Sequence, residues 1–312
     1  MLDLRRLEIL HRFAARGTIA ATASDLGYSP SAISQQLATL EREAGVALIE
    51  RTAQSASLTD AGRELVEHAA VILAAAEQAQ ARMRARAGTV SGRVNLSCIP
   101  GLAARLAPHL AALQSRHADL TIVFHETGSI DASAAVLDRS YDLSVIDDWT
   151  GRPPAADAGL AVHRLRREEV VLAVPASDPP DQTPEPVTAA RLREVARNRT
   201  WLCAPAGHLS RRGGDHRLAA AGAVPEHRWQ FEGLHILAEL VAAGTGVALL
   251  PVGAADRSGI RLLRLSPRMH RDILTLARAT ARDDPAIDAC LAAVRRALQD
   301  VGGLPDGPRP TS

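Results

Sequence analysis

The sequence predicts an α/β protein with an α-rich N-terminal region, one long helix and a larger C-terminal α/β region. Three observations lead to this prediction. Residues 17–41 hold two short helical patterns around a tight turn, and residues 63–87 form one helical pattern without glycine or proline. From residue 89 onward, strand patterns alternate with helical patterns, which is typical of a parallel sheet covered on both faces. At 312 residues, the chain is long enough for two or three lobes with separate cores.

The N-terminal region begins with an apolar stripe from Leu4 to Phe13, which predicts a helix that ends near Gly17. Two further helices flank a turn at Gly27-Tyr28. A short segment up to residue 58 then leads into the long helix.

The third predicted helix begins with Ser29 and Pro30. A serine side chain can accept hydrogen bonds from the free N–H groups at a helix start, and proline fits the first turn. The inward face is apolar: Ile33, Leu37 and Leu40. The outward face carries short uncharged hydrogen-bonding groups: Ser31, Ser34, Gln35 and Thr39. Such a face suits a helix that enters the major groove and reads base edges. The alternative is an αα-hairpin with a polar solvent face.

Three helices, a short wing and a long helix in this order resemble the N-terminal domain of LysR-type transcriptional regulators. The residues that carry the resemblance are Ser29 through Leu37, Leu40-Glu41, Gly45-Val46, Glu50-Arg51-Thr52 and Leu58-Thr59-x-Ala61-Gly62. The resemblance runs through almost the whole chain. It implies a winged helix-turn-helix DNA-binding domain over residues 1–58.

The family's DNA-contacting positions map onto seven residues of this chain: Ser29, Pro30, Ser31, Ser34, Gln35, Arg51 and Gln54. Two of them depart from the family pattern, because Pro30 stands where glutamine is common and Gln35 where arginine is frequent. Gln35 can pair bidentately with adenine, whereas Pro30 offers only apolar contact with a thymine methyl group. Arg51, at the base of a wing without other arginines, fits a structural role and a phosphate contact equally well.

The charge of this region is unusual for a nucleic-acid-binding domain. Residues 1–60 carry six arginines against seven acidic residues, whereas such domains usually show a basic footprint. The chain contains no lysine, so every permanently basic side chain is a guanidinium that can grip phosphate bidentately. We expect one dimer to bind DNA weakly or with strong salt dependence, helped by several domains acting together.

Residues 59–88 form the next unit. A helix of about 29 residues would measure roughly 43 Å, which is too long to be buried within one small domain. Its apolar stripe consists of Leu65, Ile72, Ala76, Ala79 and Met83. We expect this stripe to pack against a second copy, as the linker helix of the family does, in a homodimer or homotetramer. The alternative is a surface helix packed on its own domain.

Residues 89–300 look like the two-lobed effector-binding domain of the same regulators, which is itself similar to periplasmic solute-binding proteins. The predicted lobe I covers residues 89–163 and 268–300, and lobe II covers residues 164–267. Residues 301–312 are rich in glycine and proline and predict a disordered tail.

Small molecules bind such sheets at the carboxyl ends of the strands, in the crevice between the lobes. The candidate effector-binding residues at these strand ends are Ser97, Cys98, Ile99, Gly101, Thr127, Gly128, Cys203, Ala204, Phe231 and Glu232. Each of them could instead be a packing residue. The free N–H groups of the helix that starts near Gly101 favour an acidic or amino-acid-like effector.

Other functions find little support. The chain has no Gly-x-Ser-x-Gly elbow, no Walker lysine and no zinc-ligand spacing, so neither an enzyme nor a metal or cofactor is predicted. Cys98 and Cys203 fall at facing strand ends, which leaves a redox or soft-metal pair as the alternative to small buried cysteines. A freestanding solute-binding protein would need an export signal, and it would leave residues 1–87 unexplained.

The sequence therefore predicts a cytoplasmic regulator, because it shows no signal peptide and no stretch of 18 apolar residues. The expected partners are double-stranded DNA, a small-molecule effector and further copies of the chain, with RNA polymerase as an additional candidate and no membrane. Effector binding would bias the placement of the linker helices, and with it the spacing and bend of the DNA.

Overall fold

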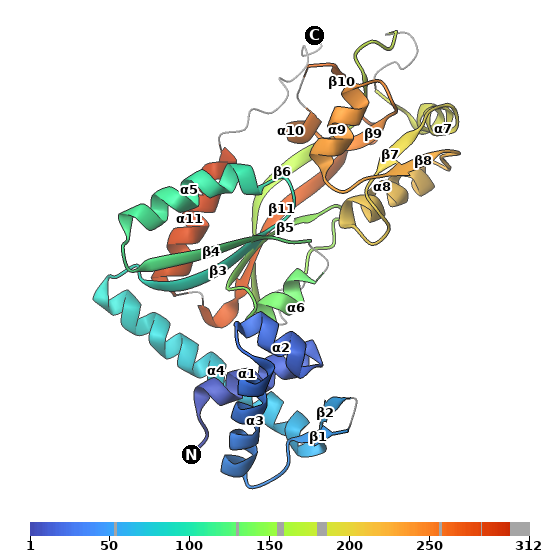
Figure 1. Ribbon diagram of the computed structural model, residues 1–312. Coiled ribbons are helices and arrows are strands. Elements are labelled where there is room, and N and C mark those ends of the chain that lie inside the picture. Colours follow the sequence, from blue (N-terminus) through green and yellow to red (C-terminus); the bar gives the residue numbers. More distant parts are fainter. Residues whose placement is uncertain are drawn as a thin grey trace.

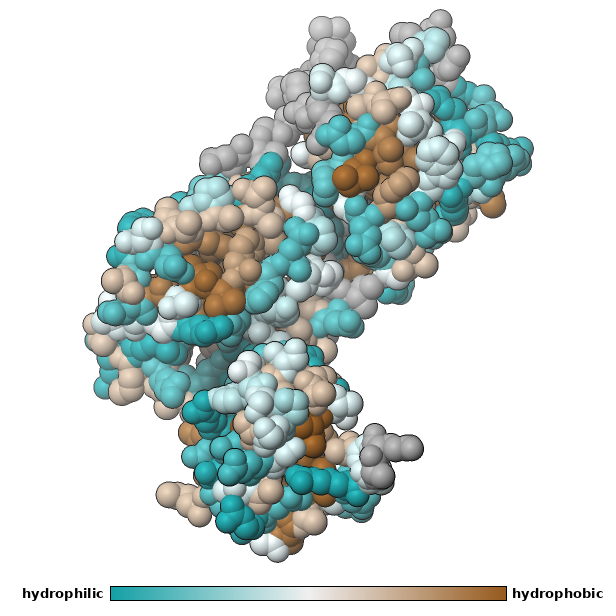
Figure 2. All heavy atoms as spheres, viewed as in Figure 1, coloured by the Kyte–Doolittle hydropathy of each residue, from teal (hydrophilic) through white to brown (hydrophobic). Residues whose placement is uncertain are grey.

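The computed structural model describes residues 1–52, 55–128, 131–154, 159–179, 186–255, 258–281 and 283–299. A helical domain lies at one end of the molecule, and the helix α4 (Asp60–Ala87) joins it to a larger α/β part (Figure 1). In the view of Figure 2, apolar surface gathers in separate areas on these parts, with polar surface between them. No helix within the described ranges is long and apolar enough to cross a membrane.

The helical domain contains α1 (Leu4–Arg16), α2 (Ile19–Leu26), α3 (Pro30–Ala44) and a wing of β1 (Ile49–Arg51) and β2 (Ala56–Leu58). Each helix starts at a side-chain cap and ends at a glycine in the left-handed conformation, and the predicted cap at Ser29 and helix end at Gly17 are among them. The inward face predicted for α3 is confirmed, because its three apolar residues are at most 1 % exposed. They pack with α1 into the core of this domain.

The wing is held to α3 through Glu41. Its carboxylate accepts hydrogen bonds from the backbone N–H groups of Leu48 and Ile49, each at 3.0 Å. Gly62, at the start of α4, passes directly over this segment, since a Cβ atom there would lie 2.1 Å from the carbonyl oxygen of Leu48. These contacts give a structural reason for two of the matched motifs, Leu40-Glu41 and Ala61-Gly62.

The long helix is observed as α4, capped by Thr59 and ended by Gly88. Its predicted apolar stripe divides between two environments. Leu65 packs on the core of the helical domain, whereas Ile72 and Met83 are exposed. The helix also contacts its own chain along its second half, because Ala81 is fully buried there and Arg84 pairs with Asp284.

The α/β part is built on one hydrogen-bonded sheet of seven described strands, in the order β10-β6-β11-β5-β3-β4 with β9 also beside β6. Their bounds are β3 (Gly92–Cys98), β4 (Leu120–Glu126), β5 (Leu143–Asp148), β6 (Leu160–Pro175), β9 (Ala248–Pro251), β10 (Ile260–Leu263) and β11 (Met269–Arg278). A separate parallel pair consists of β7 (Trp201–Cys203) and β8 (Arg228–Gln230).

The expectation of a parallel sheet is only partly correct. Strand β3 pairs in parallel with β4 and β5, but β6 runs antiparallel to β9, β10 and β11, and β11 runs antiparallel to β5. The sequence pattern predicts a strand over residues 170–174, whereas β6 starts at Leu160 and continues without a break. Charged residues at 164–169 interrupt the apolar pattern, and for this reason the pattern misses the first part of the strand.

Helices cover the sheet in two groups with separate cores. The first core lies between β3–β5 and the helices α5 (Ala103–Arg116) and α11 (Pro285–Gln299). The second involves α7 (Ala189–Asn198), α8 (Leu209–Ala220) and the far part of β6. The remaining helices among the described residues are α6 (Ala132–Leu137), α9 (Leu234–Ala242), α10 (Val252–Ala255) and the 3-10 turn η2 (Ala279–Ala281). Strands β6 and β11 pass through both groups.

A buried ionic cluster lies where β5, β6 and β11 meet. The guanidinium of Arg271 donates to Glu168 at 2.7 and 2.9 Å and to Asp147 at 3.1 Å. Trp149 donates its indole N–H to Asp147 at 2.5 Å, and the Arg271 guanidinium lies 5.5 Å from the centre of a Trp149 ring. The side chains of Arg271 and Glu168 are each 5 % exposed.

Candidate functional site

The outward face of α3 is exposed at the end of the molecule far from the sheet (Figure 1). The Ser29 hydroxyl accepts a hydrogen bond from the backbone N–H of Ala32 at 3.2 Å and lies 3.0 Å from the Ser31 hydroxyl. Pro30 occupies the first turn. Ser31 and Gln35 are exposed, and Ser34 is half-buried. A Gln35 side chain in this position is free to meet a base edge.

Arg51 connects the wing to α3 while remaining exposed. Its guanidinium lies 3.5 Å from the Ser34 carbonyl oxygen and 4.0 Å from the Glu41 carboxylate. Both distances are at the limit of an interaction, so the guanidinium is only loosely held. Its two expected roles are compatible with each other. Gln54, expected to contact DNA from the wing, lies outside the described residues.

The α/β part contains a cavity of about 640 Å³ at the carboxyl ends of β3, β4 and β5, within the range of small-molecule sites. Helix α6 and the first residues of α8 and α9 complete its walls. Five residues expected at the effector site line it: Ile99, Thr127, Gly128, Ala204 and Glu232. The crevice expected from the strand-end rule is therefore present.

The other five expected residues do not line this cavity. Ser97 is buried with its hydroxyl 2.8 Å from that of Ser144, and Cys98 is buried in the first core. Gly101 has a positive φ of 88° in the turn before α5. Cys203 faces a much smaller pocket beside α8, and Phe231 packs at the edge of an apolar cluster around α9.

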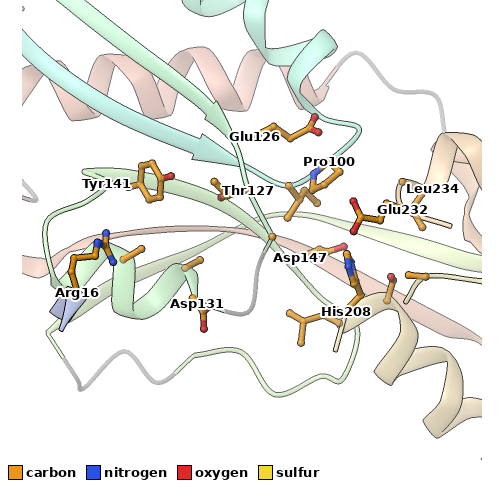
Figure 3. A pocket seen from close by; sticks show the side chains of 18 residues that line it. Arg16, Pro100, Glu126, Thr127, Asp131, Tyr141, Asp147, His208, Glu232 and Leu234 are labelled. Carbon is orange, nitrogen blue, oxygen red and sulfur yellow. The ribbon is translucent and has the colours of Figure 1, made fainter. Parts of the chain in front are cut away.

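Several lining residues were not anticipated from the sequence, including Arg16, Glu126, Asp131, Tyr141, Asp147 and His208 (Figure 3). Glu126 could have been found, because it directly precedes Thr127 and Gly128, which were expected at the crevice. Asp147 could have been found by applying the same strand-end rule to β5. Arg16 carries no such signal, since it belongs to α1 of the helical domain.

The lining opposes the expected acidic effector. The carboxylates of Glu126, Asp131 and Glu232 make no hydrogen bond or ion pair with any other described side chain, and they face the same cavity as Asp147. Against them stand one guanidinium, from Arg16, and the imidazole of His208. Unpaired carboxylates raise the free energy of a bound anion and lower that of a bound cation. This charge balance favours a ligand that carries an amine.

The thiols are buried. Burial raises the pKa of Cys98 to about 12, with the Glu126 carboxylate adding to the shift, and it raises the pKa of Cys290 to about 12 as well. The pKa of Cys203 is also raised by burial, although Arg211 and Arg228 oppose the shift. Cys98 and Cys203 belong to different cores. Both therefore have the character of small buried cysteines, and the described residues include no group of metal-ligating side chains.

Two family models match this chain. Residues 4–63 match the bacterial regulatory helix-turn-helix protein of the lysR family, and residues 87–299 match the LysR substrate binding domain. The chain belongs to the LysR family of DNA-binding transcriptional regulators with an effector-binding domain. The resemblance read from the sequence is confirmed, and the family consists of regulators, not enzymes.

Relatives align with most of the chain. The nitrogen assimilation regulatory protein nac of Escherichia coli is 28 % identical over 256 residues, which cover 81 % of this chain and 80 % of that protein. The transcriptional dual regulator GltC of Bacillus subtilis is 26 % identical over 80 % of this chain and 81 % of its own length.

Solved structures share the fold across nearly the full length. A full-length OxyR variant from Pseudomonas aeruginosa gives a TM-score of 0.66 at 20 % identity, covering 97 % of this chain and 99 % of its own. Full-length BenM gives a TM-score of 0.53 at 20 % identity, covering 98 % of this chain and all of its own.

Proposed function

We propose that two copies of this chain read a two-part DNA site with their α3 helices, and that a small amine-bearing effector in the 640 Å³ cavity controls that binding. The observation that carries the first part is the exposed polar face of α3. The unpaired carboxylates of the cavity support the second part. We retain the division into residues 1–58, 59–88 and 89–300, with the two lobes as bounded above.

The DNA-contacting set that we propose is Ser31, Ser34, Gln35, Arg51 and Gln54, with Ser29 and Pro30 setting the start of the recognition helix. The described part of this set contains a single arginine. Phosphate contacts dominate the salt dependence of DNA binding. With so few cations at the contact surface, the protein depends on a second copy and on base contacts to stay bound.

The dimer is proposed to form through α4. Val71, Ala75, Ala79 and Met83 recur every four residues along one face and are exposed, with Val71 at 70 % and Met83 at 57 %. An apolar stripe of small and medium side chains suits packing against a second α4, because small residues allow close approach of the helices. Pairing of these dimers into tetramers and a contact with RNA polymerase are proposed as further steps. The proposed place of action is the cytoplasm, where the DNA is.

The experiment that tests the proposed function is footprinting on the DNA upstream of the chain's own gene, at a stated salt concentration. We expect protection of an interrupted palindrome whose half-sites lie one helical turn, or a multiple of it, apart. Uniform or absent protection by folded protein would contradict the proposal. Titration of small amines into the same assay tests the effector class, with matched carboxylic acids as controls.

Replacing Gln35 with alanine should relax discrimination at one base pair of the operator. A bidentate side-chain contact contributes about 1–3 kcal/mol of discrimination, so the preference at that position should fall by this amount while the other positions keep theirs. Binding to a library of single-base operator variants measures the effect. Replacement of Thr39, which is half-buried on the same helix and hydrogen-bonded to Arg42, serves as the control. A uniform loss across all sequences would mean that Gln35 only positions the helix.

A further inference from the structure

Helix α1 of the DNA-binding domain is docked on the α/β part through charged and polar groups. Arg12 donates to the hydroxyl of Ser140 at 2.8 Å and to the carbonyl oxygen of Arg139. Arg16 donates to Asp138 at 3.2 Å and also contacts the Ser140 hydroxyl. These partners follow directly after α6.

The DNA-binding domain supplies a further partner. Asp25, on α2, pairs with Arg12 at 2.8 Å and with Arg16 at 3.1 Å. Together, Arg12, Arg16, Asp25, Asp138 and Ser140 form what we call the docking cluster.

The docking cluster is partly shielded from water, with the Arg16 and Asp25 side chains 30 % and 20 % exposed. The Arg12 side chain is 7 % exposed and that of Asp138 is 11 % exposed. Buried ion pairs are destabilised strongly when one partner is removed, because the other is left as an uncompensated charge. The backbone of Arg139 is held at a positive φ of 70°, a conformation that non-glycine residues rarely adopt and that surrounding contacts must maintain. The docked arrangement is thus one specific geometry.

The same segment also connects to the linker helix. The Arg139 guanidinium pairs with Glu77 of α4 at 3.2 Å, and Glu77 pairs in turn with Arg278 of β11 at 2.6 Å. Residues 138–140 therefore contact the DNA-binding domain on one side and α4 on the other.

Arg16 belongs to the docking cluster and to the wall of the effector cavity at the same time. Figure 3 shows it at one end of the cavity, with Tyr141 and Asp131 near it. Ala135, which also lines the cavity, lies on α6 just before the residues that hold Arg16. A ligand in this end of the cavity would meet a side chain of the DNA-binding domain.

We propose that Arg16 completes the effector cavity from the DNA-binding domain, so that filling the cavity with an amine-bearing ligand releases the docked domain. This inference rests on the proposed function, because it takes the cavity as the effector site. A cationic group beside Arg16 raises the free energy of the docked state by like-charge repulsion, and it competes with Arg16 for the Asp138 carboxylate. Release frees the DNA-binding domain to move relative to the α/β part, and by reciprocity the released state binds the ligand more tightly than the docked state does.

A lysine built into the cavity tests this coupling without a known ligand. Ala135→Lys places an ammonium group in the cavity, and Ala135→Met is a neutral control of similar length. Spin labels on Val46→Cys and Ala112→Cys, both exposed and on separate domains, report docking by pulsed EPR. The native thiols are buried and do not compete for the label. Labelled chains are diluted into unlabelled chains so that each measured spin pair belongs to one chain.

We expect the docked distance to dominate in the parent and in Ala135→Met, and to fall at least about threefold in population in Ala135→Lys. Arg16→Asp should also undock the domain, and the double variant Arg16→Asp with Asp138→Arg should restore docking if it restores the ion pair. Equal distance distributions for the lysine and methionine variants would overturn the proposal. So would undocking by the lysine in an Arg16→Met background, because the effect would then not pass through Arg16. Footprinting of the parent protein tests the proposed function on its own, so that its failure can be told apart from a failure of the coupling proposal.

Acidification should weaken docking through His11 of α1. Burial lowers the pKa of His11, Arg139, Arg12 and Arg278 lower it further, and Asp138 alone opposes them. Its Nδ1 atom is buried without a hydrogen-bond partner among the described residues. Because its pKa is lower in the docked state than in water, protons bind preferentially to the released state.

The docked population should therefore have its full value above pH 6.5, where His11 is neutral in both states, and it should decline as the pH falls below that value. The same spin-labelled protein, measured between pH 7.5 and 5.5, should show this decline. His11→Gln should remove most of the pH dependence. A docked population that stays constant across this range would contradict the assignment.

Discussion

Replacing Arg271 with methionine lowers the free energy of unfolding of the α/β part by about 3–5 kcal/mol, which is the expected effect of breaking a buried ion pair. The substitution leaves Glu168 at 5 % exposure and Asp147 at 10 % exposure without their shared cation. Methionine fills much of the space but cannot donate a hydrogen bond to either carboxylate. Urea-induced unfolding, followed by tryptophan fluorescence, measures the loss.

Arg167→Met is the matched control. Arg167 lies on the same strand as Glu168 and pairs with Asp272 at 2.8 and 2.9 Å, but its side chain is 54 % exposed. An exposed pair of this kind contributes at most about 1 kcal/mol. Equal losses in the two variants would mean that burial does not determine the stability contributed by the Arg271 cluster.

The double variant Val71→Glu with Ala79→Glu should convert the protein to monomers and weaken operator binding by about 10²- to 10⁴-fold, the range that bivalent attachment adds. Each substitution places a carboxylate on the stripe of α4 that is proposed to face its copy, where it would be desolvated or would repel its counterpart. Sedimentation equilibrium measures the mass in solution, and an electrophoretic shift assay on a two-half-site operator measures the affinity.

Gln80→Glu serves as the control for charge. Gln80 is exposed on α4 and lies about 180° around the helix from Val71 and about 100° from Ala79, the two substituted positions. The Gln80→Glu variant should leave both the mass in solution and the affinity for the operator unchanged. A double variant that remains dimeric would assign dimerisation to another surface.

The N-terminal half of the fold was predicted well from the sequence because its signals are local. Ser29 and Pro30 mark the start of α3, and the bounds of α4 follow from Thr59 and Gly88. Each of these residues acts on its own helix end, so its effect does not depend on the rest of the chain. The sheet order could not be predicted in the same way, because the pairing of β6 with β11 joins segments about a hundred residues apart.

The candidate site was predicted in part. Strand ends correctly indicated Ile99, Thr127 and Glu232 as cavity residues. The prediction failed at Cys98, because alternation along a strand does not show which face meets the core. Arg16 could not be predicted as a cavity residue, because its place in the cavity depends on how the two domains pack. The expected acidic effector rested on one helix start and ignored the carboxylates brought together by distant segments.

Strands β6 and β11 run from one lobe of the α/β part into the other as an antiparallel ladder, with a register shift between Ile273 and Leu274. Two lobes that are linked only by flexible loops can close on a ligand by a hinge motion. The two lobes of this protein instead share the paired strands β6 and β11, which resist such a motion. The width of the crevice is therefore set largely when the chain folds. A ligand therefore enters a cavity whose two lobes keep their separation, and selectivity rests on fit and charge with little movement of one lobe against the other.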